Sequence, residues 1–286
     1  MTTRLTTRVS RVGPASAVWA DQAAIRTQGP AAYFARTGLL VLPGLLSPTQ
    51  VERCSTEIDR VVADLSPMPN VRVIGKRSPR DPSYDLEDLP DATGRTPVRK
   101  ITGFGQLSDV LFHSLVAQPA LLAALHLVLG RRIELYRDAL MLKSAQVGQE
   151  KPWHQDAVYW PFRPMRLVSA MIAIDRAAPE NGCLQVVPGS HHQVAEHHKV
   201  DWELQVDPAG RERDAVYVPL EPGDCLIFHS LLLHASEHNT STLRRRVSIT
   251  SYSPGDLRIL DPTLVPPELL SSRPDREQES DADTEV

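Results

Sequence analysis

The segment Trp153-His154-Gln155-Asp156 places a histidine and a carboxylate two positions apart. On a β-strand, residues i and i+2 point to the same face, so both side chains could reach one point. A neutral imidazole and a carboxylate are two of the three ligands in the two-histidine, one-carboxylate triad that holds Fe(II) with open coordination positions. Because such pairs also occur on solvated loops, this interpretation needs a third ligand from elsewhere in the chain.

Two histidines further along the chain could supply that third ligand. The run from His229 to His234 is apolar between its ends. If it were one strand, Ser230, Leu232 and His234 would share a face and His229 would point to the other. Spacing alone leaves either histidine possible, and both could also be ordinary core or surface residues.

Three consecutive arginines, Arg244, Arg245 and Arg246, enter a later apolar strand. Arg245 shares a face with Val247 and Ile249, while its two neighbours share the other face. If the first face is interior, Arg245 is a buried guanidinium that needs an anion. A dicarboxylate cosubstrate would supply that anion, and the planar fork of a guanidinium binds a carboxylate through two hydrogen bonds better than an ammonium does. The alternative is a solvated basic turn, which we favour for Arg244 and Arg246.

The elements that must position these residues are mostly short strands. Alternation begins near Ile133, and later β-like runs are separated by proline- and glycine-containing turns; they are 166–174, 183–187, 215–220, 224–228, 231–234 and 245–252. Helices precede them, with expected ranges 21–37, 48–65, 109–117 and 119–129, and a short strand covers 38–42. Helices first and many short strands afterwards predict a mainly β fold with helical additions, a double-stranded β-helix or cupin-like jelly roll.

The organisation along the chain follows from composition. We expect a flexible N-terminus over residues 1–18, a single domain over 19–270 with its jelly-roll core at 131–252, and a disordered acidic tail over 271–286. Residues 66–97 are rich in proline and charge, which in a loop of this length indicates a functional segment, here a lid.

Composition also bounds the partners. A net charge of -4 argues against nucleic acid or an anionic membrane. The three cysteines, Cys54, Cys183 and Cys225, form no C-x-x-C pair, which fits a reducing cytoplasm. No apolar run reaches the ~18–20 residues of a membrane span, and no signal peptide is evident. We therefore expect a cytoplasmic protein, monomeric or homodimeric, that acts on a small molecule.

Four blocks give the sequence a resemblance to the phytanoyl-CoA dioxygenase family of Fe(II)- and 2-oxoglutarate-dependent oxygenases; they are 153–164, 180–192, 222–236 and 239–246. The resemblance implies iron ligands His154, Asp156 and His234, so His229 is not a ligand. It implies that Arg245, eleven positions after His234, holds the far carboxylate of 2-oxoglutarate.

The same resemblance implies further cosubstrate contacts from Gln155, Ser236 and, by a looser alignment, Lys100. Some members place an aromatic wall residue where this chain has Ile172. Trp160 and Phe162 could line the substrate mouth or simply pack, and His191 and His192 fall in a turn that is usually structural.

The activity that the resemblance implies is dioxygenation. With iron, 2-oxoglutarate and O2, such an enzyme oxidises an unactivated C–H bond and releases succinate and CO2. Hydroxylation is the default outcome, and desaturation or ring closure needs only different positioning. We expect a small substrate of bacterial specialised metabolism. The alternatives are an acyl-CoA hydroxylase of lipid metabolism and a non-catalytic metal-binding jelly-roll protein.

Overall fold

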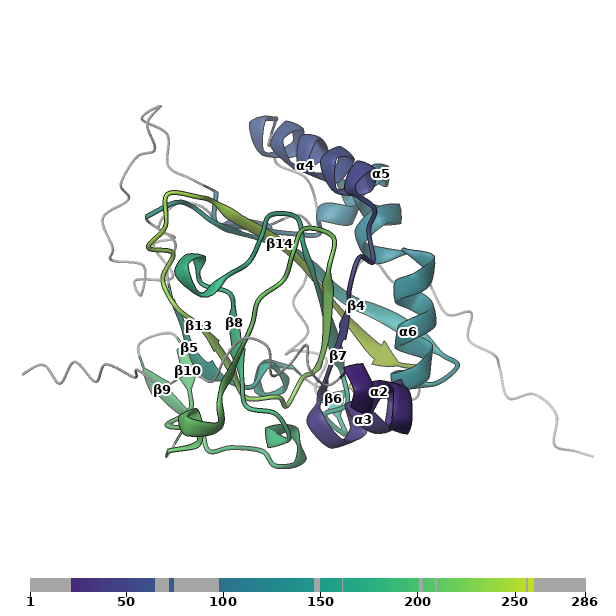
Figure 1. Cartoon of the computed structure of the whole chain (residues 1–286), viewed down its shortest axis with the longest axis vertical. Coiled ribbons are helices and arrows are strands. Elements are labelled where there is room, and N and C mark those ends of the chain that lie inside the picture. Colours follow the sequence, from purple (N-terminus) through teal and green to yellow (C-terminus); the bar gives the residue numbers. More distant parts are fainter. Residues whose placement is uncertain are drawn as a thin grey trace, which may run out of the picture.

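A computed structural model describes residues 22–64, 72–74, 98–146, 150–160, 162–200, 203–208, 210–255 and 257–259. Within them, two antiparallel β-sheets face each other and helices cover the outer face of the larger sheet (Figure 1). This is the jelly roll with helical additions that the sequence predicts. The expected N-terminal and C-terminal tails, and almost all of the segment 66–97, lie outside the described residues.

The larger sheet has seven strands in the order β1-β12-β7-β14-β4-β3-β2. Their bounds are β1 Leu39–Leu42, β2 Arg72–Ile74, β3 Lys100–Thr102, β4 Ile133–Lys143, β7 Val168–Ala173, β12 Cys225–His229 and β14 Arg245–Pro254.

The smaller sheet has four strands in the order β11-β8-β13-β5. Their bounds are β5 Lys151–His154, β8 Leu184–Val186, β11 Val216–Val218 and β13 His234–Ser236. Two further pairs are peripheral, β6 Phe162–Arg163 with β15 Arg258–Ile259, and β9 His198–Val200 with β10 Glu203–Gln205.

The helices come mainly before the strands. Their bounds are α2 Gln22–Gln28, α3 Pro30–Thr37, α4 Pro48–Ala63, α5 Asp109–Leu111, the π-helical turn η3 Phe112–Val116 and α6 Pro119–Leu129. Ser47 caps α4 and Pro48 occupies its first turn, and Gln50 completes a reciprocal capping box. Short 3-10 turns connect other elements; the one that matters for the site is η4 Asp156–Tyr159.

Alternation along β12 shows how one sheet serves two cores. Cys225 and Ile227 pack with the helices, whereas Leu226 and Phe228 pack between the two sheets. All four are essentially without solvent exposure, because a strand with both faces covered buries every side chain. The helix-side core and the core between the sheets therefore share the same strands but not the same residues.

Two predicted elements were wrong in extent. The helix expected over 21–37 is broken at Gly29, whose φ of 82° lies outside the helical region. Pro30 then starts α3, since proline tolerates the first turn of a helix and disfavours helical backbone in the residue before it. The strand expected over 231–234 is also displaced, since only His234 of that range lies in a strand. β12 ends at His229, a turn follows, and β13 begins at His234.

No single helix within the described ranges is long and apolar enough to cross a membrane. The segments Asp109–Val116 and Pro119–Leu129 pass a length and composition test only as a pair, and they are bent by 42°. In the fold, Leu121 and Leu125 of α6 pack into the helix-side core.

Candidate metal centre

Two histidines meet across the smaller sheet. His154 is the last residue of β5 and His234 is the first residue of β13, and the two are direct partners in the antiparallel register. Their ring centroids lie 4.1 Å apart, and both side chains are buried. Directly opposed residues in an antiparallel pair bring their side chains together, so the register itself creates the pair.

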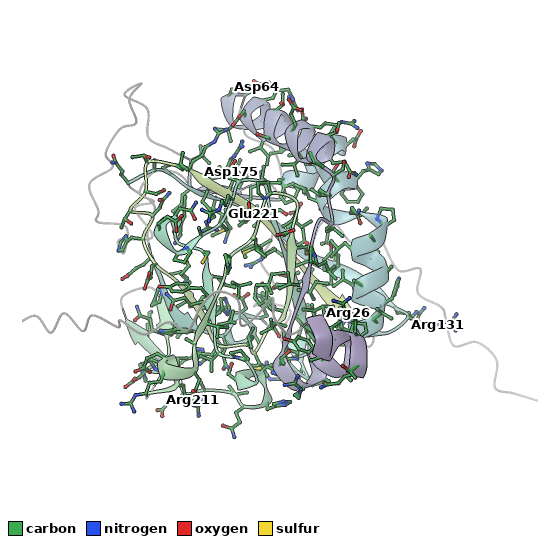
Figure 2. The ribbon with its side chains drawn as sticks, in the orientation of Figure 1. Arg26, Asp64, Arg131, Asp175, Arg211 and Glu221 are labelled. Atoms are coloured by element: carbon green, nitrogen blue, oxygen red, sulfur yellow. The ribbon has the colours of Figure 1, made fainter. Side chains whose placement is uncertain are left out.

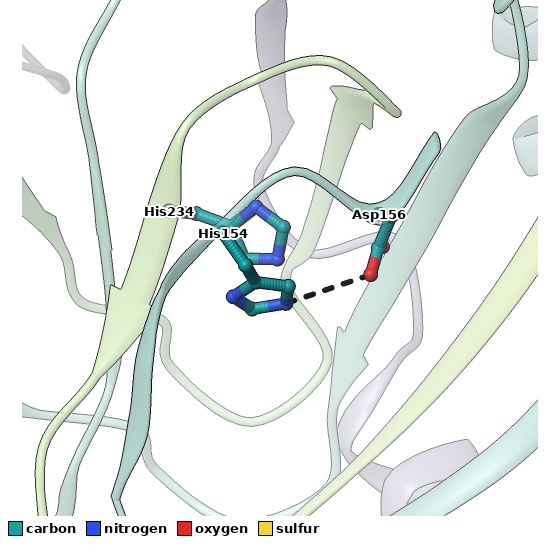
Figure 3. Close-up of side chains that lie close together, drawn as sticks. All are labelled: His154, Asp156 and His234. Carbon is teal, nitrogen blue, oxygen red and sulfur yellow. Dashed lines mark ion pairs between the residues drawn. The ribbon is translucent and has the colours of Figure 1, made fainter. Parts of the chain in front are cut away.

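Asp156 joins them from the start of η4. The strand ends two residues earlier than the simplest interpretation of the H-x-D spacing requires. Gln155 nevertheless keeps an extended backbone, with φ −121° and ψ 126°, so Asp156 still points to the side of His154. Its Oδ1 lies 3.6 Å from His154 Nε2 (Figure 3). One potential ligand atom from each of the three residues falls within a 4.8 Å cluster.

The backbone fixes which nitrogen of each histidine faces that cluster. His154 Nδ1 lies 2.8 Å from the Pro152 carbonyl oxygen, and His234 Nδ1 lies 2.8 Å from that of Leu232. A carbonyl only accepts, so each Nδ1 carries the proton and donates it. Each Nε2 is then left with a free lone pair, the arrangement in which metal-ligating histidines are oriented by a second hydrogen bond.

The electrostatics favour a charged aspartate beside His234. Burial alone would raise the pKa of Asp156, but the neighbouring His154, His234 and Arg137 hold it well below its usual range. Burial, and then the neighbouring His154, lower the pKa of His234 to about 4. Two neutral nitrogen donors and one anionic oxygen donor are the ligand set of the Fe(II) facial triad, so the residues present fit that metal.

The triad opens into a cavity of about 390 Å³ between the two sheets. Arg245 lines this cavity from the first position of β14 and is only 6% exposed. Its Nε is buried without a hydrogen-bond partner among the residues that the structure describes. Burial lowers the pKa of Arg245 to about 10, so the guanidinium stays charged at neutral pH. A buried, charged and incompletely paired guanidinium calls for an anion.

A second cation that our sequence interpretation missed lies beside it. Lys143 pairs with Arg245 in the β4–β14 register and also lines the cavity. Its Nζ donates to Ser236 Oγ at 3.0 Å and to the Glu237 carbonyl. Burial, and then the charge of Arg245, lower the pKa of Lys143 to about 7. The signal was present in the sequence, since Lys143 continues the alternation of Ala139 and Met141 toward the interior.

Gly182 makes room for this lysine. The glycine has a φ of 76°, and a Cβ there would lie 2.8 Å from Lys143 Nζ and would also collide with the Glu237 carbonyl. Only a residue without a side chain adopts that backbone at low cost and leaves the ammonium in place.

The remaining predicted site residues divide into two groups. Ser236 and Lys100 line the cavity with the triad and Arg245. Gln155 is not among the described lining residues. Its amide donates to the Gln193 and Leu231 carbonyls at 2.8 and 2.6 Å and accepts from the Ala195 amide at 2.9 Å. These three backbone bonds occupy the side chain that we expected to contact the cosubstrate, and they place Gln155 as a brace behind the triad.

The walls of the cavity also differ in detail from the expectation. Ile172 packs on the helix side, and the apolar surface comes instead from Met171, Phe228 and Ile249. Trp160 lines the cavity, whereas Phe162 packs against Tyr136 at a centroid distance of 4.7 Å.

The other conspicuous histidines lie outside the cavity. His229 Nδ1 accepts from the Leu231 amide at 3.0 Å, and its ring lies 5.2 Å from that of His191. His191 Nε2 in turn contacts the Ala35 carbonyl at 3.1 Å. The described part of the chain brings neither residue into the triad.

The structure corrects one interpretation of the arginines. Arg244 is exposed as expected, but Arg246 is only 4% exposed. Its guanidinium contacts both Asp175 oxygens at 2.8 Å and Asp59 at 2.9 Å. The outer face of β14 is covered by α4, so a side chain that would be solvated on a bare sheet is buried here and paired.

Comparisons with known proteins agree with this geometry. The family model described as Phytanoyl-CoA dioxygenase (PhyH) matches residues 34–247. The peroxisomal phytanoyl-CoA dioxygenase of Mus musculus is 27% identical over 244 residues, which cover 80% of this chain and 69% of the relative. L-proline trans-4-hydroxylase of Streptomyces griseoviridis is 28% identical, with 77% of this chain and 84% of the relative covered.

Solved structures share the fold at lower identity. The epimerase SnoN in complex with Fe3+, alpha ketoglutarate and nogalamycin RO superposes with a TM-score of 0.65 at 22% identity, covering 84% of this chain and 87% of that one. EctD from S. alaskensis with 2-oxoglutarate and 5-hydroxyectoine superposes with a TM-score of 0.64 at 23% identity, covering 85% and 82%.

Proposed function

The chain belongs to the phytanoyl-CoA dioxygenase family, and from that membership we propose that it is an Fe(II)- and 2-oxoglutarate-dependent dioxygenase of a small organic molecule. It uses O2 to oxidise a C–H bond and releases succinate and CO2. Hydroxylation is the default outcome, with desaturation or cyclisation open to a substrate held differently. The proposed setting is bacterial specialised metabolism.

One observation carries this proposal. The His154–Asp156–His234 cluster and the incompletely paired Arg245 guanidinium line the same cavity. A metal-binding protein without catalysis would need the cluster but would have no use for the buried cation. A dicarboxylate that reaches from the metal to Arg245 explains both features together.

The residues divide the work between them. His154 and His234 would hold the metal through Nε2, and Asp156 would supply the anionic oxygen. Arg245 would bind the far carboxylate of 2-oxoglutarate, with Lys143 and Ser236 beside it. The bound iron, 2-oxoglutarate and O2 supply the oxidising power that removes hydrogen from an unactivated C–H bond.

The cavity walls would control what reaches that centre. Met171, Phe228 and Ile249 present apolar surface near the site, which excludes water from the reacting groups. The cavity volume of about 390 Å³ falls in the range of small-molecule sites. This favours a compact substrate over the acyl-CoA alternative, which the mouse relative would otherwise suggest. The three cysteines are free and buried, in keeping with the cytoplasmic location that we propose.

The test is succinate formation. Wild-type protein incubated with Fe(II), ascorbate and 2-oxoglutarate should release succinate even without a primary substrate, at a slow uncoupled rate. His234→Ala should abolish this release and most of the iron binding, because it removes a ligand. His229→Ala is the matched control, since it removes a buried histidine outside the cluster, and it should retain both. Absence of succinate from wild-type protein that binds iron would sink the proposal.

A further inference from the structure

A local irregularity in β4 brings two neighbouring side chains into the cavity. Tyr252 on β14 pairs with Leu135 and Ser251 pairs with Arg137, so Tyr136 is an extra residue that forms a β-bulge. Successive residues of a regular strand face opposite ways, and a bulge re-aims them. Tyr136 and Arg137 therefore both line the cavity, although simple alternation would direct only one of them inward.

Arg137 lies against an aromatic surface. Its guanidinium carbon is 5.4 Å from the centre of the Trp160 ring, and Tyr136 packs edge-on to the same tryptophan at 5.5 Å. The Nε of Arg137 is buried with no hydrogen-bond partner within the described part of the chain. Stacking occupies the face of a guanidinium and leaves its in-plane N–H groups available to an anion.

The cavity as a whole carries an excess of positive charge. Six basic side chains line it and only two acidic ones, Glu150 and Asp156. Arg137 acts on its neighbours, since burial and then the charges of Arg137 and Arg99 lower the pKa of Lys100 to about 7.

The two ends of this cavity are well separated along β4. Lys143, beside Arg245, and Arg137 lie on this strand six positions apart. At the rise of a β-strand their backbone positions are roughly 20 Å apart. A 2-oxoglutarate bound between the metal and Arg245 is far shorter than that span. It leaves the part of the cavity lined by Arg137 open to a second ligand.

We infer that the primary substrate is a small organic anion whose carboxylate or phosphate group binds Arg137 while its body packs against Trp160 and Tyr136. This inference rests on the proposed function and specifies its substrate class. Arg137 fixes one end of the substrate, and because Arg137 and the His154–Asp156–His234 cluster line the same cavity, a C–H bond of that substrate can be held near the metal site. A neutral molecule of the same shape lacks the anchor.

Calorimetric titration with simple probes tests the inference. Protein loaded with Fe(II) and saturating 2-oxoglutarate, kept anaerobic, is titrated with phenylacetate, phenyl phosphate and the neutral isostere phenylacetamide. At least one anion should bind roughly 10- to 100-fold more tightly than the amide, the range expected for a charge-assisted hydrogen bond. The tighter of the two anions identifies whether the site is built for carboxylate or phosphate.

Variants assign the preference to one residue. Arg137→Met keeps the apolar stem, and it should remove the preference for the anion without weakening the amide; Arg137→Lys should restore part of it. Arg132→Met removes the same charge from an exposed position just before β4 and should change nothing. Each of these measurements needs only folded protein. The difference between anion and amide affinity in the wild-type protein can be measured even if a variant does not fold.

Three results would overturn the inference. They are equal binding of anion and amide, an anion preference that survives Arg137→Met, and an anion that binds only when 2-oxoglutarate is left out of the titration, which would place it at Arg245 instead. Succinate formation in the same preparations separates the two levels. Succinate without an anion preference refutes the substrate class alone, whereas absence of succinate refutes the proposed function.

Discussion

At the residue scale, the site consists of buried polar groups that differ in which of their atoms already have a partner. The histidines are satisfied on one side by backbone carbonyls and present Nε2 on the other. Arg245 keeps an Nε without a partner among the described residues, and Lys143 is buried beside it. A buried cation costs free energy unless it is paired, so each of these groups indicates what should bind next to it.

Removing the buried guanidinium should weaken cosubstrate binding strongly. Losing a charge-assisted contact at a buried site costs roughly 2–4 kcal/mol, so Arg245→Ala should raise the 2-oxoglutarate requirement by roughly 30- to 1000-fold. Arg245→Lys should recover part of the loss, because it keeps the charge and loses the fork. The measurement is succinate formation against 2-oxoglutarate concentration. Arg244→Ala is the control, since that residue is exposed, and an equal effect there would contradict the assignment.

Lys143 should make cosubstrate binding depend on pH. Its folded pKa lies at about 7 because burial and Arg245 disfavour the ammonium, and Glu150, Glu237 and Cys183 oppose that shift. The charge is therefore present below this pH and lost above it. Wild-type affinity for 2-oxoglutarate should fall by roughly 10-fold between pH 6 and pH 9, the difference between a charged and a neutral hydrogen bond.

The Lys143→Met variant isolates this effect from the titration of other groups. It should bind 2-oxoglutarate more weakly than wild type at pH 6 and about equally at pH 9. Affinity is measured by titration of the iron-loaded protein under anaerobic conditions. A ratio of the two affinities that stays constant with pH would exclude Lys143 as the source.

At the element scale, β14 connects the site to the helical layer. Arg245 points inward from this strand and Arg246 points outward, where it contacts Asp175 and the helix α4 through Ser55 and Asp59. Figure 2 shows Asp175 below α4, at the same end of the molecule. The pairing fixes the position of α4 over the strand that carries Arg245.

Breaking the buried contact of Arg246 with Asp175 should destabilise the fold more than breaking the exposed contact of Arg244 with Asp59. Arg246→Ala removes both guanidinium hydrogen bonds to Asp175, and it should lower the free energy of unfolding by about 2–3 kcal/mol. Arg244→Ala should cost under ~1 kcal/mol, because its contact with Asp59 is exposed. Urea denaturation of the three proteins gives both values. Equal stability of the two variants would show that the buried contact contributes no more free energy of unfolding than the exposed one.

At the scale of the whole molecule, two hydrophobic cores share one sheet. The helix-side core includes residues from α3, α4 and α6, and several residues of the core between the sheets line the cavity. Figure 1 shows the helices on one side of the large sheet and the small sheet on the other. A cavity-forming substitution in either core should therefore lower stability, but only one in the core between the sheets should also affect the site.

Adjacent residues of β12 offer the comparison. Leu226→Ala and Ile227→Ala should each lower the free energy of unfolding by about 2–5 kcal/mol, because both side chains are fully buried. Only Leu226→Ala should also weaken iron binding, since that residue packs between the large sheet and the small sheet that carries both histidines. Iron stoichiometry measured at a temperature where both variants are folded decides this. Equal iron loss in both would mean that the cores act as one.

The sequence by itself determined the fold class, the order of the strands along the chain and the residues that could act together. Period-2 alternation and turn residues indicate where strands lie, and the H-x-D spacing offers two candidate ligands, because both are local patterns. The third ligand, His234 rather than His229, was implied by the resemblance to the family. Ser47 and Pro48 likewise specify the start of α4 through local hydrogen bonding.

Tertiary structure alone decided which faces were buried and which neighbours met. The register of β5 against β13 opposed the two histidines, and the cover of α4 buried Arg246. The register of β4 against β14 set Lys143 beside Arg245, and a bulge turned Tyr136 and Arg137 toward one cavity. These outcomes depend on contacts between residues far apart in the chain, and a one-residue change of register would reverse them, so no local pattern could fix them.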